Sequence, residues 1–365
     1  MKIVVTGTRG IPDIQGGVET HCEQLYPRIA AMGHDVTVIR RDSYVVPENR
    51  RSEFKGVKLV DVYAPRRKSI EAAVHTFLAV IKARRLNPDV LHIHAIGPSL
   101  MVPFARLLGM RVVSTNHGPD YDRQKWGKVA RTALRLGERL GAKYSNKVIV
   151  ISNVIAGILR DNYGRVDTEL IFNGVENPEK SSSRNYLREW GIDGKPYVVA
   201  LGRFVKEKGF HDLIEAYRRS GLSERYSLVI AGDSDHPDEY SEALKRQAAE
   251  AGAVLTGFIR GERLNQLMSN ASLFVLPSYH EGLPIALLEA MSYGIDVIVS
   301  DIPANRIPEL DKTDFFPAGD VDALSTLLKK KTVADVATRT YDLSNYDWDA
   351  IAARTVDVYR QVCES

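Results

Sequence analysis

Residues 273–294 read LFVLPSYHEGLPIALLEAMSYG, and this stretch decides how the second half of the chain folds. Its first four residues are apolar and predict a buried strand, and the residues after the Glu-Gly-Leu-Pro loop predict a helix. Strand, loop and helix in this order form the unit of a parallel sheet. Pro284 suits the first helical position, because its ring presets the backbone angle and its missing N–H has no intrahelical partner there.

The loop and the helix start carry two carboxylates eight residues apart. Glu281 precedes the helix, and Glu289 lies about 7.5 Å along its axis at roughly 1.5 Å per residue. Free amides of the first turn, together with the positive end of the helix dipole, form a seat for a phosphate group. The stretch therefore predicts an anion site with a carboxylate on either side, at Gly282, Leu283, Pro284 and Ile285.

Strands and helices alternate through both halves of the chain. In the first half we expect strands at 2–6, 35–39, 57–62, 89–94, 111–115 and 147–151, with helices at 18–32, 70–85, 99–108 and 125–144. In the second half we expect strands at 197–201, 227–231, 254–256, 273–276 and 297–299. Residues 176–184 are polar and turn-rich, which is typical of a linker. The sequence thus predicts an α/β protein with two doubly wound sheets in tandem and a ligand cleft between them.

Length and composition favour a two-domain globular protein. The chain has 365 residues, 44% of them hydrophobic and 26% charged, which is more than one ordinary core requires. Cys22 and Cys363 lie at opposite ends and indicate a reducing compartment. The sequence shows neither a signal-peptide pattern nor an uncharged apolar stretch of about 18 residues. We therefore expect a cytoplasmic protein without a spanning helix.

Charge is distributed unevenly along the chain. Residues 1–180 contain 28 Lys and Arg against 18 Asp and Glu, a net charge of +10, whereas the remainder contains 21 against 28, a net charge of −7. Within 121–143, bases recur at three- and four-residue spacing between apolar residues. Such a helix can lie on an anionic membrane surface, or it can be a solvated outer helix of the domain. No nucleic-acid-binding module accompanies the bases, and no nucleic-acid partner is expected.

Two loops that follow strands could hold an anion. Gly16 and Gly17 at the first helix start would let backbone amides approach a phosphate or a sugar, although ordinary turn glycines are the alternative. Their spacing is not the dinucleotide fingerprint. Arg203 and Lys208 follow the strand at 197–201 and would neutralise a diphosphate, or they are solvated surface charges. The anion seat at 282–285 favours the diphosphate.

Metal binding is the less favoured interpretation of two patterns. His92, His94, His117 and Asp120 could form a zinc site, but neither His-Glu-x-x-His nor Cys-x-x-Cys accompanies them, and hydrogen-bonded structural histidines are more usual. The pattern at 233–235, Asp-Ser-Asp, can hold a divalent metal, but turn chemistry explains it better. We expect no metal and no cofactor.

Five motifs together resemble the signature of family 4 retaining glycosyltransferases, which have the GT-B fold. They are Gly16-Gly17-Val18-Glu19, His117-Gly118, Asn173-Gly174-Val175, Gly202-Arg203 with Lys208-Gly209, and Glu281 with Glu289. The resemblance covers nearly the whole chain in order. The opening at 7–12 is similar to a subgroup that includes bacterial rhamnosyltransferases of surface-polysaccharide assembly.

The resemblance implies two Rossmann-like domains that face a central cleft. It implies an acceptor-binding domain at 1–178, a nucleotide-sugar donor-binding domain at 190–344, and a C-terminal helix at 345–365 that crosses back onto the first domain. It also implies a role for each motif residue: Arg203 and Lys208 hold the donor diphosphate, Glu289 the ribose and Glu281 the transferred sugar, while His117 and the Gly16-Gly17 loop contribute from the acceptor domain and Phe258-Ile259 borders the base. At 231–233 the sequence departs from the Gly-x-Gly turn of many members, which leaves the base and the donor open.

The expected activity is a retaining, metal-independent glycosyl transfer. A hexose or deoxyhexose, with rhamnose among the candidates, would pass from a UDP-, dTDP- or GDP-linked donor to a glycan or lipid-linked acceptor in bacterial surface-polysaccharide assembly. Glu281, His117, Arg203 and Lys208 form the expected catalytic set, and the protein would act in the cytoplasm or peripherally on the inner face of the membrane. The alternatives are a nucleotide-sugar 2-epimerase and a catalytically silent carbohydrate-binding or scaffold subunit.

Overall fold

The computed structural model describes residues 1–65, 71–122, 127–234, 237–333 and 338–364. The chain divides into two compact units. The first unit comprises Met1–Gly174 together with Tyr346–Ser365, and the second unit comprises Val175–Asn345. Parts of two predicted patterns lie outside the described residues, namely positions 123–126 of the basic stretch and Asp235 of the Asp-Ser-Asp pattern.

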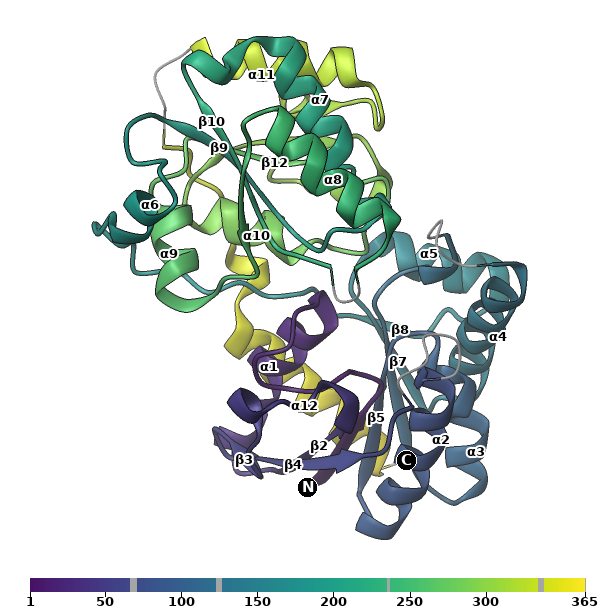
Figure 1. Ribbon diagram of the computed structural model, residues 1–365. Helices are drawn as coiled ribbons and strands as arrows, with labels where there is room; N and C mark the ends of the chain where they lie inside the picture. The colour runs from purple at the N-terminus through teal and green to yellow at the C-terminus, as the bar shows by residue number, and fades with distance from the viewer. Residues whose placement is uncertain (66–70, 123–126, 235–236, 334–337, 365) are drawn as a thin grey trace. The chain divides into compact units, whose positions relative to one another are not determined.

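The first unit is a layered α/β structure (Figure 1). Its strands and main helices are β1 (Lys2–Thr6), α1 (Gly17–Ala31), β2 (Asp35–Arg41), β3 (Glu53–Phe54), β4 (Val57–Val62), α2 (Glu71–Leu86), β5 (Val90–His94), η3 (Pro98–Met101), α3 (Val102–Leu107), β6 (Val112–Asn116), α4 (Lys128–Tyr144), β7 (Lys147–Val150), α5 (Asn153–Tyr163), β8 (Thr168–Leu170) and α12 (Trp348–Glu364). The sheet order is β3-β4-β2-β1-β5-β6-β7-β8, and only the β3–β4 pair among these is antiparallel.

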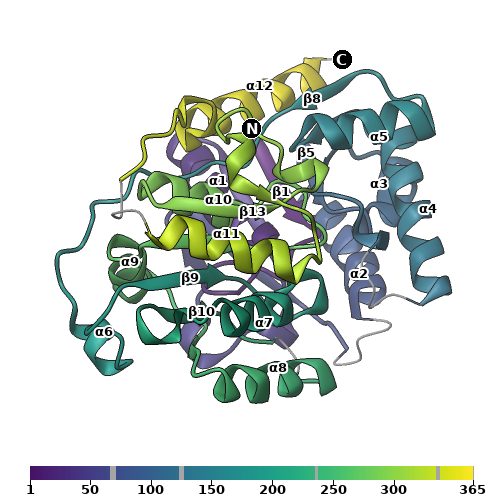
Figure 2. The same cartoon turned by 90° about the horizontal axis from the view of Figure 1, so that it is seen from above.

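Alternate residues of the first sheet pack against two different helix layers. Ile3 and Val5 lie in one core with residues of α1 and α12, whereas Val4 lies in another core with residues of α2 and α3. Alternation of this kind follows from the two-residue period of a strand. α1 and α12 lie side by side in both views (Figures 1 and 2). The predicted return of a C-terminal helix to the first unit is confirmed.

The second unit has an all-parallel sheet in the order β11-β10-β9-β12-β13-β14. Its strands and helices are α6 (Asn185–Glu189), β9 (Tyr197–Leu201), η5 (Lys206–Lys208), α7 (Phe210–Ser220), β10 (Ser227–Ala231), α8 (Glu239–Glu250), β11 (Val254–Gly257), α9 (Gly261–Ser269), β12 (Leu273–Leu276), α10 (Ile285–Ser292), β13 (Asp296–Ser300), β14 (Phe315–Phe316) and α11 (Val321–Val333). The predicted strands at 197–201, 227–231 and 273–276 are confirmed with these bounds.

Both faces of the second sheet are covered. Figure 1 shows α7, α8 and α11 on one face and α9 and α10 on the other. Val198 and Val275 lie in the core under the first group, and Val199 and Phe274 lie in the core under the second. This continuous burial explains why the strands read as unbroken apolar runs. Both units are therefore doubly wound, as predicted.

Candidate functional site

The order of the second sheet brings two loops to one crevice. The chain passes from β9 to β10 on one side of β9, and β12 pairs with β9 on the other side. At such a reversal the loops that follow the two strands diverge and leave a crevice at the carboxyl edge of the sheet. Arg203 and Lys208 follow β9, and Glu281 follows β12. The loops that carry these predicted donor residues therefore meet at this edge.

Gly209 fixes how closely the two loops approach. It has a φ of +65°, and a Cβ atom there would lie 2.1 Å from the carbonyl oxygen of Pro277. The amide of Tyr279 also donates a hydrogen bond of 2.8 Å to the carbonyl of Glu207. Only glycine combines this backbone angle with this approach. The Lys-Gly pair of the sequence motif is thus the point at which the loop after β12 packs on the loop after β9.

Lys208 and Glu281 form an ion pair across these loops. The Nζ atom of Lys208 lies 2.6 Å from Oε1 of Glu281, and the two side chains are only 20% and 10% exposed. At this burial the pair is screened less by solvent than a surface pair would be. The cation and the carboxylate thereby hold each other at the mouth of the crevice.

Pro284 was predicted at the first helical position, and this prediction is wrong. Pro284 has a ψ of 111° and precedes the helix, which begins at Ile285. Its carbonyl accepts hydrogen bonds of 3.1 and 3.3 Å from the amides of Leu287 and Leu288. By helix geometry the amides of Ile285 and Ala286 have no partner within the helix. The predicted anion seat would thus consist of the start of α10 with Pro284 as its N-cap.

Glu289 is the partly buried carboxylate of α10. Burial raises its pKa from 4.5 to about 7, and the nearby Glu176 carboxylate adds to the shift. A carboxyl group in this environment changes its charge near neutral pH. Such a group accepts hydrogen bonds from ligand hydroxyls more readily once it is ionised.

The remaining donor-site residues have different exposures. Arg203 is partly buried and follows Gly202 directly. Phe258 is 45% exposed, and the Arg260 guanidinium lies 5.1 Å from its ring centroid. Ile259 is only 8% exposed and packs in the core of the second unit. Of the predicted base-bordering pair, Phe258 offers its ring, whereas the side chain of Ile259 is occupied in the core.

The first unit has its own reversal of strand order, between β1 and β5. A Cβ atom at Gly7 would lie 2.2 Å from the carbonyl oxygen of His94, so the loop after β1 rests directly on the end of β5. Glu19 in α1 holds this loop, because it accepts hydrogen bonds from the Thr8 hydroxyl (3.1 Å) and the Arg9 amide (3.0 Å). The Glu of the Gly-Gly-Val-Glu motif is therefore a structural support.

Gly16 and Gly17 differ in what surrounds them. A Cβ atom at Gly16 would lie 2.0 Å from Oε2 of Glu19, whereas one at Gly17 would have no heavy atom within 4 Å. The first glycine is required by the close approach of Glu19. The second lies in the first turn of α1, whose first N–H groups have no partner within the helix, and the predicted approach of this loop to a phosphate or a sugar stays a prediction.

His117 lies on a turn that β6 and two helices hold in place. The side chain of Asn116 accepts from the Gly118 amide (2.9 Å) and donates to Oε1 of Glu138 in α4 (3.0 Å). The hydroxyl of Tyr163 in α5 donates to the other oxygen of Glu138 (2.9 Å). These contacts fix the turn on which His117 lies.

Imidazoles cluster around His117. The ring centroid of His21 lies 5.0 Å from that of His117, and Nδ1 of His94 lies 2.9 Å from Nε2 of His117. His21 is bonded through Nδ1 to Oδ1 of Asn173 (3.0 Å), which gives the Asn-Gly-Val motif a role. Burial lowers the pKa of His21 to about 4, and it lowers the pKa of His94 and of His117 well below the usual value. These rings are neutral at physiological pH.

Nitrogen atoms of His21, His94 and His117 lie within 4.8 Å of one another, a spacing that could hold a metal ion. Three neutral imidazoles are ligands that zinc accepts. Both nitrogens of His94 are nevertheless engaged, because Nδ1 bonds His117 and Nε2 bonds the Tyr26 hydroxyl. A metal ion bound to either nitrogen of His94 would have to displace one of these hydrogen bonds. The donor set fits the hydrogen-bonded interpretation better than the zinc interpretation.

Sequence patterns did not predict the residues that support this cluster. Tyr26 bonds His94, and Asn116 bonds the turn of His117. Tyr359 bonds His92, whose ring stacks on that of His94. The residues that form these hydrogen bonds are up to 267 positions apart in the sequence. A periodicity search therefore has no local signal by which to find them.

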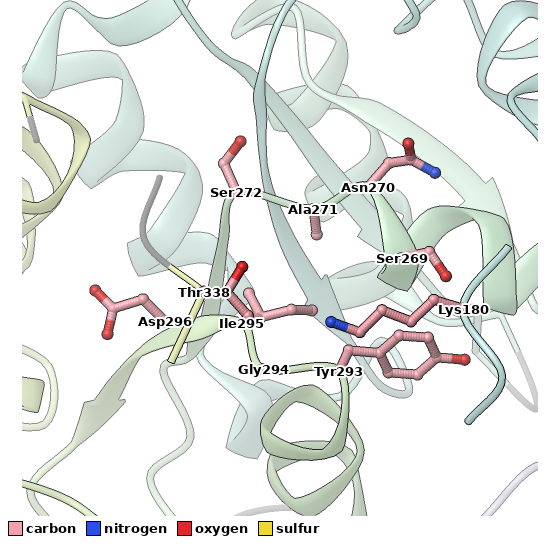
Figure 3. A pocket seen from close by; sticks show the side chains of 10 residues that line it. All are labelled: Lys180, Ser269, Asn270, Ala271, Ser272, Tyr293, Gly294, Ile295, Asp296 and Thr338. Atoms are coloured by element: carbon pink, nitrogen blue, oxygen red, sulfur yellow. The ribbon is translucent and has the colours of Figure 1, made fainter. Parts of the chain in front are cut away.

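A separate cavity of about 230 Å³ lies elsewhere in the second unit (Figure 3). Most of its lining directly precedes or begins β12 and β13, and Lys180 and Thr338 join it from other parts of the chain. The residues before β12 are Ser269, Asn270, Ala271 and Ser272, and those at β13 are Tyr293, Gly294, Ile295 and Asp296. It is therefore at the amino edge of the sheet, and Glu281 and Lys208 are at the carboxyl edge. The cavity belongs to a different part of the unit from the predicted site.

α4 presents a basic outer face. Lys128, Arg131, Arg135, Arg139 and Lys143 are exposed, and Val129 beside them is 86% exposed. The inner face packs on the turn after β5, because a Cβ atom at Gly137 would lie 2.1 Å from the carbonyl oxygen of Ile96. α4 is thus an outer helix of the unit with a row of bases toward solvent. No helix within the described ranges is long and apolar enough to cross a bilayer.

Two family models together match most of the chain. The model described as glycosyl transferases group 1 matches residues 182–330, and the model described as glycosyltransferase family 4 matches residues 15–177. An uncharacterized glycosyltransferase of Methanocaldococcus jannaschii is 26% identical and aligns with 100% of this chain and 99% of its own length.

Solved structures share the same architecture. Sucrose-phosphate synthase of Thermosynechococcus elongatus has a TM-score of 0.81 at 22% identity, and the alignment covers 99% of this chain and 98% of that chain. The Anabaena protein HepE, solved in complex with UDP-glucose, has a TM-score of 0.74 at 16% identity over 100% and 98% of the two chains.

Proposed function

The chain belongs to glycosyltransferase family 4 and has the GT-B fold, and from this premise we propose that it is a retaining hexosyltransferase. The donor is a nucleotide-diphosphate sugar, and the acceptor is a glycan or a lipid-linked saccharide of bacterial surface-polysaccharide assembly. A hexose or deoxyhexose is transferred, with rhamnose among the candidates. HepE, a structural relative, was solved with UDP-glucose, which supports a donor of this class.

The observation that carries the proposal is the Lys208–Glu281 pair beside the start of α10. In the proposed complex Lys208 and Arg203 turn to the diphosphate, and the first amides of α10 bind its oxygens. Glu281 is then released to accept hydrogen bonds from the sugar. Glu289 accepts from the ribose hydroxyls.

The proposed reaction breaks the bond between the anomeric carbon and the diphosphate oxygen. Negative charge develops on the leaving diphosphate, and fixed cations and helix amides stabilise it without reorganisation. A double displacement needs a carboxylate nucleophile opposite a second acid, whereas in the proposed complex Glu281 is assigned to hydrogen bonds with the sugar. We therefore favour a front-face transfer in which the diphosphate oxygen takes the proton of the acceptor hydroxyl as the new glycosidic bond forms. The two cations and the amides supply the positive charge for this step, which supports a metal-independent reaction.

The second unit holds the donor and the first unit takes the acceptor in this proposal. The basic row on α4 would attach the first unit to an anionic membrane at its inner face, where lipid-linked acceptors are present. Each Lys or Arg close to such a surface contributes about 1 kcal/mol. Vesicle sedimentation with and without anionic lipid tests this part separately from the chemistry.

A thermal-shift screen against UDP, GDP, dTDP and their sugars tests the donor assignment. A nucleotide that binds the folded state raises the melting temperature, and Lys208→Met should remove most of that increase. Lys206→Met is the matched control, because Lys206 is exposed in the same turn. No stabilisation by any of the nucleotides would overturn the donor site.

Product analysis separates transfer from the alternatives. Release of nucleoside diphosphate that depends on a saccharide acceptor supports transfer, and the anomeric configuration of the product reports retention or inversion. Conversion of the donor to an isomer without an acceptor would instead identify a 2-epimerase. Binding without either product would identify a silent subunit.

A further inference from the structure

A set of buried histidine, tyrosine and threonine side chains of the first unit forms a hydrogen-bonded chain that ends at His117. Its links are Thr115 Oγ1 with His92 Nε2 (2.7 Å), the Tyr359 hydroxyl with His92 Nδ1 (2.6 Å), the Tyr26 hydroxyl with His94 Nε2, and His94 Nδ1 with His117 Nε2 (2.9 Å). The Tyr26 hydroxyl also lies 3.0 Å from His92 Nδ1, which joins the two halves. Every member before His117 is at most 1% exposed.

Counting protons shows which tyrosine hydroxyl donates to which histidine. A neutral imidazole has one N–H and one acceptor nitrogen, and a phenol is a stronger acid than a neutral imidazole N–H. Tyr359 is closer to His92 Nδ1 than Tyr26 is, at 2.6 Å against 3.0 Å, so Tyr359 donates to that nitrogen. The Tyr26 hydroxyl also shares a hydrogen bond with the Tyr359 side chain. An imidazole nitrogen is a stronger base than a phenol oxygen, so the proton of Tyr26 goes to His94 Nε2.

This donation fixes both following rings. If His94 accepts at Nε2, its own proton is on Nδ1 and is donated to Nε2 of His117. His117 then carries its proton on Nδ1, the nitrogen that His94 does not occupy. Burial keeps the rings neutral, since it lowers the pKa of His94 and of His117 well below the usual value.

We propose that Tyr26 acts through His94 as a positioning residue that fixes His117 in the Nδ1–H tautomer. His117 then presents a neutral hydrogen-bond donor to an oxygen of the ligand. The identity of that oxygen, a sugar hydroxyl or a phosphate oxygen, rests on the proposed function. The tautomer itself is a property of the free protein.

Histidine tautomers are read directly from two-bond and three-bond ¹H–¹⁵N correlations in protein labelled with ¹⁵N-histidine. In the free wild-type protein, both His94 and His117 should show a protonated Nδ1 and an unprotonated Nε2 at neutral pH. A protonated Nε2 on either ring, or a charged His117, would overturn the proposal. This measurement needs no substrate and no variant, so it decides the tautomer even where a variant does not fold.

Tyr26→Phe removes the proton that His94 Nε2 accepts. Both rings should then shift toward the Nε2–H tautomer. Thr115→Val is the matched control, because it removes a hydroxyl from the far end of the same chain, at His92. It should leave the signals of His94 and His117 unchanged. A Tyr26→Phe protein that kept the Nδ1–H tautomer would refute the role of Tyr26.

The functional half of the proposal has its own readout. Tyr26→Phe should lower kcat/KM for transfer about five- to tenfold, the effect of one neutral hydrogen bond, with the loss following the fraction of the wrong tautomer. A changed tautomer with unchanged transfer would show that His117 does not donate to the ligand. A wild-type protein that binds no nucleotide sugar would refute the proposed function and leave the tautomer assignment intact.

Discussion

Replacement of Glu289 by Gln tests the burial of the α10 carboxylate, because it removes the charge and keeps the shape of the side chain. The pKa of Glu289 rises from 4.5 to about 7 on folding, chiefly through burial and secondarily through Glu176. An acid whose pKa is raised by folding stabilises the folded state below its unfolded pKa. That contribution is lost as the pH rises from about 4.5 through about 7.

The size of the effect follows from the same values. One pKa unit corresponds to about 1.36 kcal/mol. Integration from pH 5 to pH 8 therefore lowers the free energy of unfolding of the wild type by about 2.5 kcal/mol relative to that of the Gln variant. In a unit of this size, each kcal/mol of stability changes the melting temperature by about 2 to 4 °C. The difference in melting temperature between the two proteins should therefore be roughly 5 to 10 °C larger at pH 8 than at pH 5. The variant should therefore melt higher than the wild type at pH 8, with the difference much smaller at pH 5.

Thermal unfolding of the ligand-free proteins at the two pH values measures this difference. Glu250→Gln is the control, because Glu250 is exposed at the end of α8 and its replacement should shift both melting temperatures equally. Equal differences at pH 5 and pH 8 for Glu289→Gln would refute the burial of this carboxylate. If ribose hydroxyls bind the ionised group, calorimetry in two buffers should also show proton release on nucleotide binding by the wild type but not by the variant.

Three further predictions concern the second unit and the proposed reaction. Gly209→Ala and Gly221→Ala both place a Cβ atom on a residue with a φ near +65°, but only the Cβ atom at 209 would collide with the carbonyl of Pro277. In urea denaturation, Gly221→Ala should lower the free energy of unfolding by about 1 kcal/mol. Gly209→Ala should lower it by about 1 to 3 kcal/mol more. Lys208→Met should lower the free energy of unfolding more than the double variant Lys208→Met with Glu281→Gln, because the single change leaves a buried carboxylate unpaired. The double-mutant cycle should give a coupling energy of about 1 to 3 kcal/mol, and losses of stability that simply add would mean that the pair contributes nothing. Dialysis against a chelator should leave release of nucleoside diphosphate unchanged; activity that is lost and then restored by Mg²⁺ or Zn²⁺ would contradict the metal-independent step.

Much of the fold could be predicted because its signals are local. Buried parallel strands read as apolar runs, and 197–201 and 273–276 are found by that pattern alone. β8 and β14 were missed because they have only three and two residues, too few for a periodic signal. The position of Pro284 was wrong because Pro is accepted both at the N-cap and at the first helical residue, and the ψ of one residue decides between them.

The candidate site was predictable where its residues follow strands. Lys208 and Glu281 are 73 positions apart, yet both lie just after strands that neighbour each other in the sheet, which the alternation of elements makes foreseeable. The support of His117 was not predictable, because Tyr26 and Tyr359 come from α1 and α12. Their meeting depends on the packing of those helices, which leaves no pattern in either segment.

The return of α12 to the first unit has a consequence for synthesis on the ribosome. Trp348 packs against Gly174, where a Cβ atom would lie 2.4 Å from the indole, and Tyr359 bonds His92. The first unit therefore cannot complete its core until α12 has been made, whereas Val175–Asn345 is continuous in the chain. Domains generally fold as units during translation, starting from the N-terminus. In this chain the first unit is translated first but completes its folding last. Until α12 is made, the surface of α1 that α12 covers stays exposed, and we expect chaperones to bind it.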